Sequence, residues 1–154
     1  MSSSISSFRS SRPEETEALA RQFVSIAKAG DVFLLEGDIG AGKSVFARAF
    51  VREAVGSSID VPSPTFTLVQ TYDANIGEIW HCDLYRLTSP DDVFELGLDL
   101  AFTTSISLIE WPDRLGEETP STALHVSFQD EDDTRSIRFS GDQSWAERVA
   151  SLDV

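Results

Sequence analysis

One eight-residue segment constrains the fold more than any other feature of this sequence. Residues 37–44 read Gly-Asp-Ile-Gly-Ala-Gly-Lys-Ser and fit the pattern G-x-x-x-x-G-K-[S/T]. The short apolar run of residues 32–35 precedes the segment. Over residues 43–55 the apolar residues recur with helical spacing, at Val45, Phe46, Ala49, Phe50 and Ala54. In this context the pattern predicts a phosphate-binding loop, or P-loop, between a buried strand and a helix.

Each residue type in this loop has a physical role in holding a polyphosphate. The glycines let the backbone turn tightly, so that successive N–H groups point at one anion. The following helix directs its positive dipole end toward the same anion. Lys43 is expected to reach the β- and γ-phosphates, and the Ser44 hydroxyl to ligate magnesium.

The loop therefore predicts both the ligands and the residues that bind them. The predicted ligands are ATP and Mg²⁺. Val45, the next residue, has no hydroxyl, so it is given no ligand contact and counts only as an apolar position of the helix. The alternative to a phosphate-binding loop at residues 37–44 is a glycine-rich turn that contains a lysine by chance. The predicted binding residues of the loop are Gly37, Asp38, Ile39, Gly40, Ala41, Gly42, Lys43 and Ser44.

Further helices and strands are predicted from apolar periodicity and from turn residues. One helix begins near Ser11, which has capping-box spacing to Glu14, and ends before Gly30. Short helices are also predicted after residues 89–92 and after Gly141. The predicted strands cover residues 32–35, 65–72, 78–84 and 105–109, and a hairpin joins residues 122–128 to 135–139.

This order of elements predicts the fold class and the domain organisation. Strands that alternate with helices, followed by a late hairpin, indicate an α/β fold. We expect a P-loop NTPase-like sandwich with a mixed, partly parallel β-sheet flanked by helices. Residues 1–10 are rich in serine and are expected to be disordered or to form an irregular edge. Residues 11–150 are expected to form a single domain.

The charge balance argues against direct binding to nucleic acid. The 154 residues include 12 Lys and Arg against 26 Asp and Glu, which gives a formal net charge of −14. Such a chain repels a phosphate backbone unless its basic residues cluster, and they do not cluster in the sequence. The acidity fits a protein partner with a basic face, or it serves solubility alone.

Other bulk features bear on the compartment. No apolar run approaches the roughly 20 residues that span a bilayer, and the amino terminus lacks the apolar stretch of a secretory signal. Cys82 is the only cysteine, which fits a reducing compartment. We therefore expect a cytoplasmic protein without membrane contact.

Two acidic residues at predicted strand ends, Asp83 and Glu110, are candidates both for catalysis and for binding magnesium, and Lys43 is the third catalytic candidate. Asp83 follows residues 79–82, and Glu110 follows residues 106–109. A P-loop ATPase needs a carboxylate for magnesium at the end of a neighbouring strand, and a group that positions water. Glu110 is preferred as the metal ligand because its strand is the more continuously apolar. The alternative is that both are solvated acids at strand ends.

Two further residues are weaker candidates. Thr65 follows Pro62, Ser63 and Pro64, and a hydroxyl on such a stiffened loop is suited to sensing a γ-phosphate and its metal. The alternative is an ordinary threonine at the start of a strand. His81 lies on a predicted strand, where a histidine is more often structural than catalytic.

Four segments together resemble the bacterial TsaE (YjeE) ATPases. They are residues 37–44, 63–69, 81–87 and 109–112, they occur in the order of that family, and residues 14–16 precede the first helix in the same way. The resemblance covers roughly residues 12–140. It implies that Lys43 holds the phosphates and that Ser44 and Glu110 bind magnesium. Asp83 would lie in the same catalytic neighbourhood. Thr65 would lie in a switch-like segment, and Thr16 near the adenine. Ser44 stands where threonine is commoner in the family, which keeps the hydroxyl.

The resemblance also implies a biological role. TsaE proteins support formation of N6-threonylcarbamoyladenosine at position 37 of tRNAs that read codons beginning with A. In that system a TsaD–TsaB pair transfers the threonylcarbamoyl group, and TsaE binds the pair and hydrolyses ATP. The partners, not this acidic chain, would then contact the tRNA.

Three other functions remain open at this point. A small P-loop kinase normally brings several arginines to the transferred phosphate, and Arg86 and Arg114 are the only isolated candidates in the middle of the chain. A GTPase usually carries an N-K-x-D motif, whereas the sole asparagine, Asn75, precedes isoleucine. A non-catalytic adaptor that only binds nucleotide needs nearly the same loop as an ATPase.

Overall fold

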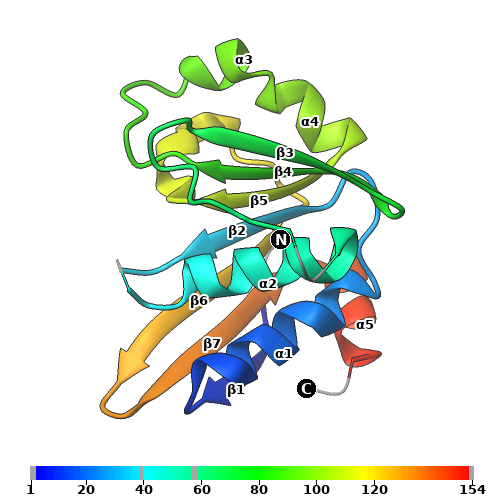
Figure 1. The fold of residues 1–154 in the computed structure, drawn as a ribbon, viewed down its shortest axis with the longest axis vertical. Helices are drawn as coiled ribbons and strands as arrows, with labels where there is room; N and C mark the ends of the chain where they lie inside the picture. Colours follow the sequence, from blue (N-terminus) through cyan, green and yellow to red (C-terminus); the bar gives the residue numbers. More distant parts are fainter. Residues whose placement is uncertain (1–2, 39, 57–58, 153–154) are drawn as a thin grey trace.

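A seven-stranded mixed β-sheet runs through the middle of the computed structural model, which describes residues 3–38, 40–56 and 59–152 (Figure 1). The strands are β1 (Ser3–Ser10), β2 (Val32–Glu36), β3 (Val69–Ala74), β4 (Gly77–Asp83), β5 (Ile106–Glu110), β6 (Leu124–Glu131) and β7 (Thr134–Gly141). The helices are α1 (Pro13–Val24), α2 (Lys43–Val55), α3 (Asp92–Leu96), α4 (Leu98–Thr104) and α5 (Gln143–Ala150), with a 3₁₀ segment η1 (Pro112–Glu118).

The strand order brings the carboxyl ends of four parallel strands together. The order is β1-β7-β6-β2-β5-β4-β3, in which β6, β2, β5 and β4 pair in parallel. The outer pairs β1/β7, β6/β7 and β3/β4 are antiparallel. Glu110 at the end of β5 pairs with Asp83 on β4 and with Leu35 on β2. In open α/β sheets, ligands bind outside these carboxyl ends.

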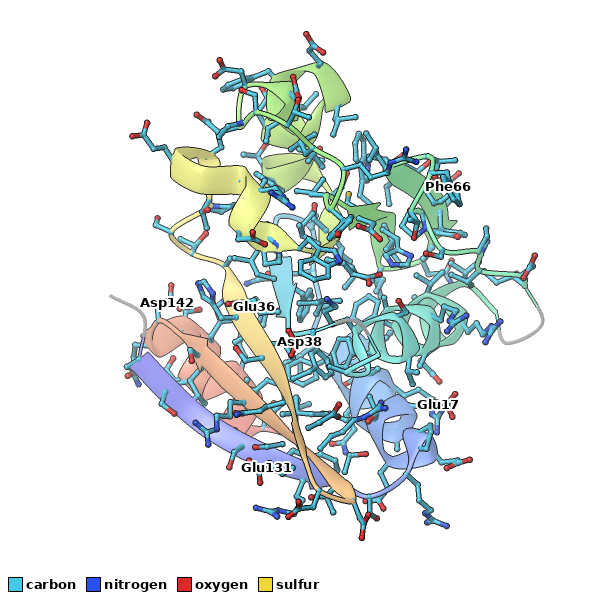
Figure 2. The ribbon with its side chains drawn as sticks, turned by 90° about the vertical axis from the view of Figure 1, so that its left-hand side faces the viewer. Glu17, Glu36, Asp38, Phe66, Glu131 and Asp142 are labelled. Carbon is cyan, nitrogen blue, oxygen red and sulfur yellow. The ribbon has the colours of Figure 1, made fainter. Side chains whose placement is uncertain are left out.

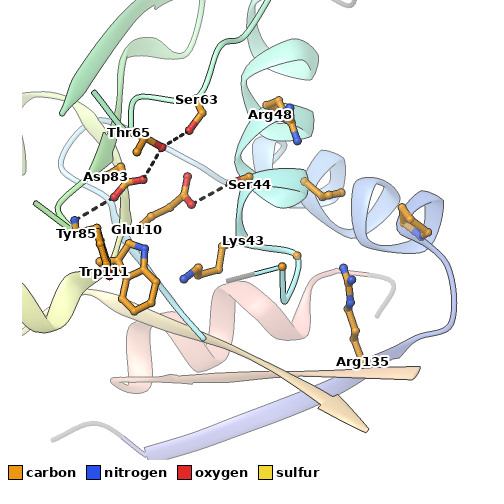
Figure 3. Close-up of a pocket in the computed structure, with 14 residues that line it drawn as sticks. Lys43, Ser44, Arg48, Ser63, Thr65, Asp83, Tyr85, Glu110, Trp111 and Arg135 are labelled. Carbon is orange, nitrogen blue, oxygen red and sulfur yellow. Dashed lines mark hydrogen bonds between the residues drawn. The ribbon is translucent and has the colours of Figure 1, made fainter. Parts of the chain in front are cut away.

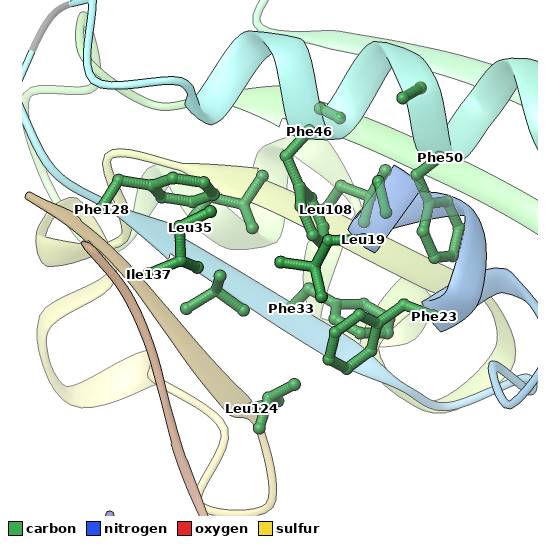
Figure 4. Packing of buried hydrophobic residues seen from close by; sticks show 14 of the residues in the cluster. Leu19, Phe23, Phe33, Leu35, Phe46, Phe50, Leu108, Leu124, Phe128 and Ile137 are labelled. Carbon is green, nitrogen blue, oxygen red and sulfur yellow. The ribbon is translucent and has the colours of Figure 1, made fainter. Parts of the chain in front are cut away.

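The side chains of β2 alternate between two hydrophobic clusters, one on each face of the sheet. Phe33 and Leu35 pack with α1 and α2, whereas Val32 and Leu34 pack with residues of α3 and α4. The first cluster is rich in aromatic rings (Figure 4): the centroid of Phe33 lies 5.4 Å from that of Phe50 on α2. Burying each such ring contributes about 1.5–3 kcal/mol. This packing fixes α2 against β2, and with it the loop that joins them.

The segment of residues 3–10 differs from its prediction. We expected disorder or an irregular edge, whereas these residues form a strand, β1, which pairs with β7 at the edge of the sheet. The hydrogen bonds between β1 and β7 are made by backbone groups and so do not depend on which side chains the strand carries. In addition, Ile5 and Phe8 pack against the main hydrophobic cluster. A register irregularity between Ser4 and Ser6 helps Ile5 and Phe8, three residues apart, to reach the same core.

Other predicted boundaries are confirmed or corrected by the structure. The strand expected over residues 65–72 begins only at Val69, because residues 65–67 form a turn in which the Leu68 N–H donates to the Pro64 carbonyl (2.7 Å). Helix α1 begins at Pro13, and the Ser11 hydroxyl donates to the Glu15 carboxylate instead of capping the helix. Helix α4 and η1 have no counterpart in the prediction. Among the described residues, no helix combines the length and the apolar character that crossing a membrane requires.

Candidate active site

The loop between β2 and α2 needs glycine at two positions. Gly37 has φ +145°, and a Cβ there would lie 2.6 Å from the carbonyl oxygen of Phe128. Gly42 has φ +110° and precedes the first turn of α2, where its carbonyl accepts from the Phe46 N–H (3.0 Å). A side chain at either position would clash or strain the backbone. Ile39, one of the predicted binding residues, lies outside the described residues.

The Lys43 side chain is buried against this loop. Only 4% of the residue is exposed, and its Nζ donates to the Gly37 carbonyl. The same ammonium lies 3.7 Å from the ring centroid of Trp111. Burial lowers the pKa of Lys43, and the nearby carboxylates of Glu110 and Asp83 oppose that shift. The ammonium is therefore largely desolvated, which strengthens its attraction for an anion.

Ser44, Glu110 and His81 form a continuous hydrogen-bonded chain. The Ser44 hydroxyl donates to Oε1 of Glu110 (3.0 Å), and Nε2 of His81 lies 2.7 Å from Oε2 of the same carboxylate. Helix α2 supplies the serine, β5 the glutamate and β4 the histidine. Mg²⁺ prefers hard oxygen ligands and usually takes one or two carboxylates together with phosphates and waters. Ser44 and Glu110 fit that requirement.

A second set of hydrogen bonds ties the segment before β3 to the end of β4. The Thr65 hydroxyl donates to Oδ2 of Asp83 (3.2 Å) and lies 2.7 Å from the Ser63 hydroxyl. Oδ1 of Asp83 accepts from the Tyr85 N–H (3.0 Å). Asp83 is buried and is the register neighbour of Glu110. Any movement of residues 63–65 therefore alters the partners of a carboxylate beside Glu110.

These groups surround one cavity of about 530 Å³. Figure 3 shows Lys43, Ser44 and Glu110 in its middle, Thr65 and Asp83 on one side, and Arg135 away from them across the loop. The volume lies within the usual range of about 300–1,000 Å³ for small-molecule sites. In the described part of the chain, no group of three or more His, Cys, Asp and Glu side chains is arranged to hold a metal.

Most of the sequence-predicted residues lie at this cavity, but not all of them. Gly37 and Asp38 line a neighbouring cavity of about 360 Å³ instead, and Ala41 is buried. Thr16, which the resemblance put near the adenine, is fully buried, and its hydroxyl donates to the Ser10 hydroxyl (2.9 Å). The structure therefore does not bring Thr16 to the cavity. The predicted residues that line it are Gly40, Gly42, Lys43, Ser44, Thr65, Asp83 and Glu110.

Val45 lies at the cavity although it was counted only as an apolar position of the helix. It is on α2 as predicted, but it is half-buried and lines the cavity, whereas Phe46 beside it is fully buried in the main hydrophobic cluster. Its side chain has neither a hydrogen-bond donor nor an acceptor, so it can supply only an apolar wall. Polar contacts to a ligand in this part of the cavity would therefore have to come from neighbouring residues such as Lys43 and Ser44.

The cavity also contains residues that sequence reasoning missed. Arg48 lies one helical turn after Ser44 on α2, so its spacing in the helix was a usable signal. Arg135 comes from β7, and its Nη1 is 3.0 Å from the position that a Cβ on Gly42 would take. Trp111 packs against Tyr85 with ring centroids 5.0 Å apart and ring planes tilted by 60°. Nothing local in the sequence pointed to Arg135, because only the sheet order brings it to the loop.

Comparison with known proteins agrees with this geometry. Residues 10–137 match the family model described as threonylcarbamoyl adenosine biosynthesis protein TsaE. The chain belongs to the TsaE family. The matched range includes the P-loop, both strand-end carboxylates and Arg135, so the cavity lies within the part of the chain that matches the family.

Alignments with individual relatives cover most of this chain. The tRNA threonylcarbamoyladenosine biosynthesis protein TsaE of Rickettsia bellii is 38% identical over 124 residues, covering 80% of this chain and 86% of that protein. The protein of the same name from Bacillus subtilis is 38% identical over 135 residues, covering 86% and 84%. The crystal structure of Bacillus subtilis YdiB superposes with a TM-score of 0.76 at 29% identity, covering 97% of this chain and 93% of that one. The predicted α/β fold with a mixed, partly parallel sheet is confirmed.

Proposed function

We propose that this chain is a Mg²⁺-dependent ATPase that binds a TsaD–TsaB pair and supports formation of N6-threonylcarbamoyladenosine at position 37 of tRNA. The observation that carries the ATPase proposal is the contact between the Ser44 hydroxyl and the Glu110 carboxylate (3.0 Å) beside the buried ammonium of Lys43. A hydroxyl, a carboxylate and an ammonium at the carboxyl ends of parallel strands are the groups that phosphoryl transfer to water requires.

The residues of the cavity have separate roles in the proposed hydrolysis of ATP. Lys43 exchanges the Gly37 carbonyl for phosphate oxygens, and the loop N–H groups orient the same phosphates. Ser44 and Glu110 would hold Mg²⁺, which, when bound, neutralises charge that develops on the phosphates. Asp83 accepts from Thr65, so the two are suited to orient a water or to respond to the γ-phosphate.

Hydrolysis distinguishes this proposal from the alternatives. Phosphate release from ATP, measured with and without Mg²⁺ and with and without the TsaD–TsaB pair, is expected to require the metal. A kinase would transfer the phosphate to a second substrate, and an adaptor would bind ATP without releasing phosphate. A GTPase would prefer GTP to ATP. Release from ATP that is independent of Mg²⁺, or absent even with the partners, would contradict the proposal.

The link to partner proteins rests on the segment of residues 63–66. Its Thr65 contacts Asp83 at the cavity, while Phe66 is 84% exposed (Figure 2). The Phe66 ring centroid lies 5.3 Å from the Arg86 guanidinium. One end of this segment therefore faces the nucleotide site and the other faces outward. A partner that contacts Phe66 can respond to nucleotide only if its affinity differs between the ATP and ADP states.

We expect that the isolated chain does not bind tRNA but is needed for its modification. The chain has a net charge of −14, and its acidic side chains are spread over the fold, as Glu17 on α1, Glu131 on β6 and Asp142 between β7 and α5 illustrate (Figure 2). Such a chain repels a phosphate backbone. Anisotropy titration with tRNA measures the binding, and reconstitution of the modification with and without the chain measures the need. Tight binding by the chain alone at physiological salt, or sustained multi-turnover modification in its absence, would refute this expectation.

Arg135→Ala is expected to weaken ATP binding about tenfold, which is about 1.4 kcal/mol. The guanidinium lines the cavity from β7, and its loss removes a charged donor from the phosphate side of the loop. Arg9→Ala is the matched control, because Arg9 on β1 pairs with Glu131 on the hairpin (3.3 Å) and does not line the cavity. Calorimetric titration measures both variants, and equal affinities would exclude Arg135 from the site.

A further inference from the structure

We propose that His81 is a positioning residue that holds the Glu110 carboxylate in the orientation in which it faces Ser44. The inference rests on the proposed function, in which Ser44 and Glu110 hold Mg²⁺. It assigns a task to a buried polar side chain that the proposed mechanism does not otherwise use. His81 is 0% exposed and Glu110 is 3% exposed, so solvent does not orient either group.

The strand register places the two side chains against each other. His81 on β4 pairs with Leu108 on β5, and Glu110 lies two residues beyond Leu108 on the same face of the sheet. Ile79 and Leu108, which share this face, belong to the cluster under α2. The His81 side chain is therefore on the α2 side of the sheet, the same side as Asp83, which follows it by two residues on β4.

The two oxygens of the carboxylate have different partners. Oε2 of Glu110 lies 2.7 Å from His81, whereas Oε1 accepts from Ser44 at 3.0 Å. An ionised carboxylate only accepts hydrogen bonds, so Nε2 of His81 must be the donor. With one oxygen held on the sheet side, the carboxylate plane is fixed and the other oxygen stays directed at the serine on α2.

The other ring nitrogen indicates which role His81 has. Within the described residues, Nδ1 of His81 is buried without a hydrogen-bond partner. A histidine whose only role was to pack in the core would be expected to form hydrogen bonds with both ring nitrogens, since a buried unpaired polar atom costs about 1–3 kcal/mol. Among the described residues, the hydrogen bond to Glu110 is the one polar contact of the ring. Removing that donor leaves Oε2 buried and unpaired, and the carboxylate is then free to rotate away from Ser44.

Two substitutions of nearly equal length separate positioning from packing. In His81→Gln the side-chain amide donates from about the place of Nε2, whereas His81→Met fills similar space without a donor. His81→Asn, whose amide is too short to reach that place, is a second non-donor should His81→Met fail to fold. Ser107→Ala is the matched control, because the Ser107 hydroxyl is also buried without a partner in the described residues and lies on the opposite face of β5.

The decisive measurement is ADP and ATP affinity by calorimetry with Mg²⁺ and with a chelator, alongside thermal melting. We expect His81→Met to reduce the Mg²⁺-dependent gain in ATP affinity about tenfold, the size typical of groups that support metal ligands. Its affinity in chelator should stay within about twofold of the unmodified chain, and His81→Gln should restore most of the gain. Ser107→Ala should change neither affinity.

Other outcomes identify which idea fails. If His81→Gln and His81→Met lose the Mg²⁺ gain equally, or both keep it while melting at lower temperature, His81 has only a packing role and the inference is overturned. If the unmodified chain shows no Mg²⁺-dependent gain and no hydrolysis, the proposed function itself fails. The two failures are therefore distinguishable from one set of titrations.

Discussion

Lys43→Ala is expected to abolish measurable ATP hydrolysis and to weaken nucleotide binding while the chain stays folded. The substitution removes the desolvated ammonium beside Glu110 and Trp111. A charge-assisted hydrogen bond contributes about 1.5–3 kcal/mol, which corresponds to roughly a 10- to 100-fold loss of affinity. The loss in hydrolysis should be larger, about a thousandfold, because charge builds up in the transition state where this group acts. Phosphate release and thermal melting, measured on the same preparation, test both parts.

The fold is expected to survive because Lys43 contributes little to the core. Its ammonium contacts the Gly37 carbonyl and the Trp111 ring, whereas the aromatic cluster that joins α2 to β2 is formed by other residues. Lys28→Ala is the matched control, since Lys28 is the other lysine of the sequence and its contact with the Asp31 carboxylate uses the backbone N–H. Hydrolysis at the unmodified rate by folded Lys43→Ala would refute the assignment of the loop as the ATP site.

The elements that carry the site were predictable because their signals are local. Helix α2 begins at Lys43 and ends at Val55 as its apolar spacing predicts, and β2, β4 and β5 lie within a residue of their predicted bounds. An apolar run that ends in a carboxylate already indicates a parallel strand with an acid at its carboxyl end. Knowledge that Asp83 and Glu110 are neighbours required the register, which the sequence does not encode locally.

The unpredicted parts depend on contacts between distant segments. The serine-rich β1 becomes a strand only because β7 offers it an edge, and the turn of residues 65–67 depends on the hydrogen bonds of Thr65 to Asp83 and Leu68 to Pro64. Arg135 reaches the P-loop across the sheet from the late hairpin. Thr16 points into the core under β1, which its place on an amphipathic helix did not reveal.

Glu110→Ala is expected to remove Mg²⁺-dependent hydrolysis almost completely, by about a hundredfold or more, with a smaller effect on folding. The carboxylate is the one acidic group that contacts the Ser44 hydroxyl in the described part of the chain, and metal-assisted charge stabilisation amounts to several kcal/mol. The variant leaves the Nε2 donor of His81 buried without its partner, so a modest fall in melting temperature is also expected. Phosphate release as a function of Mg²⁺ concentration measures the main effect.

The same substitution is expected to have the opposite effect on nucleotide binding in a chelator. Without the metal, the Glu110 carboxylate repels the phosphates and attracts the Lys43 ammonium, so its removal should tighten ATP binding several-fold. Asp83→Asn is the matched comparison, because Asp83 also attracts Lys43 but its carboxylate contacts Thr65 and not Ser44. We expect Asp83→Asn to slow hydrolysis with little change in the Mg²⁺ concentration required. Normal hydrolysis by Glu110→Ala, together with a raised Mg²⁺ requirement in Asp83→Asn, would instead make Asp83 the metal ligand and reverse the two roles.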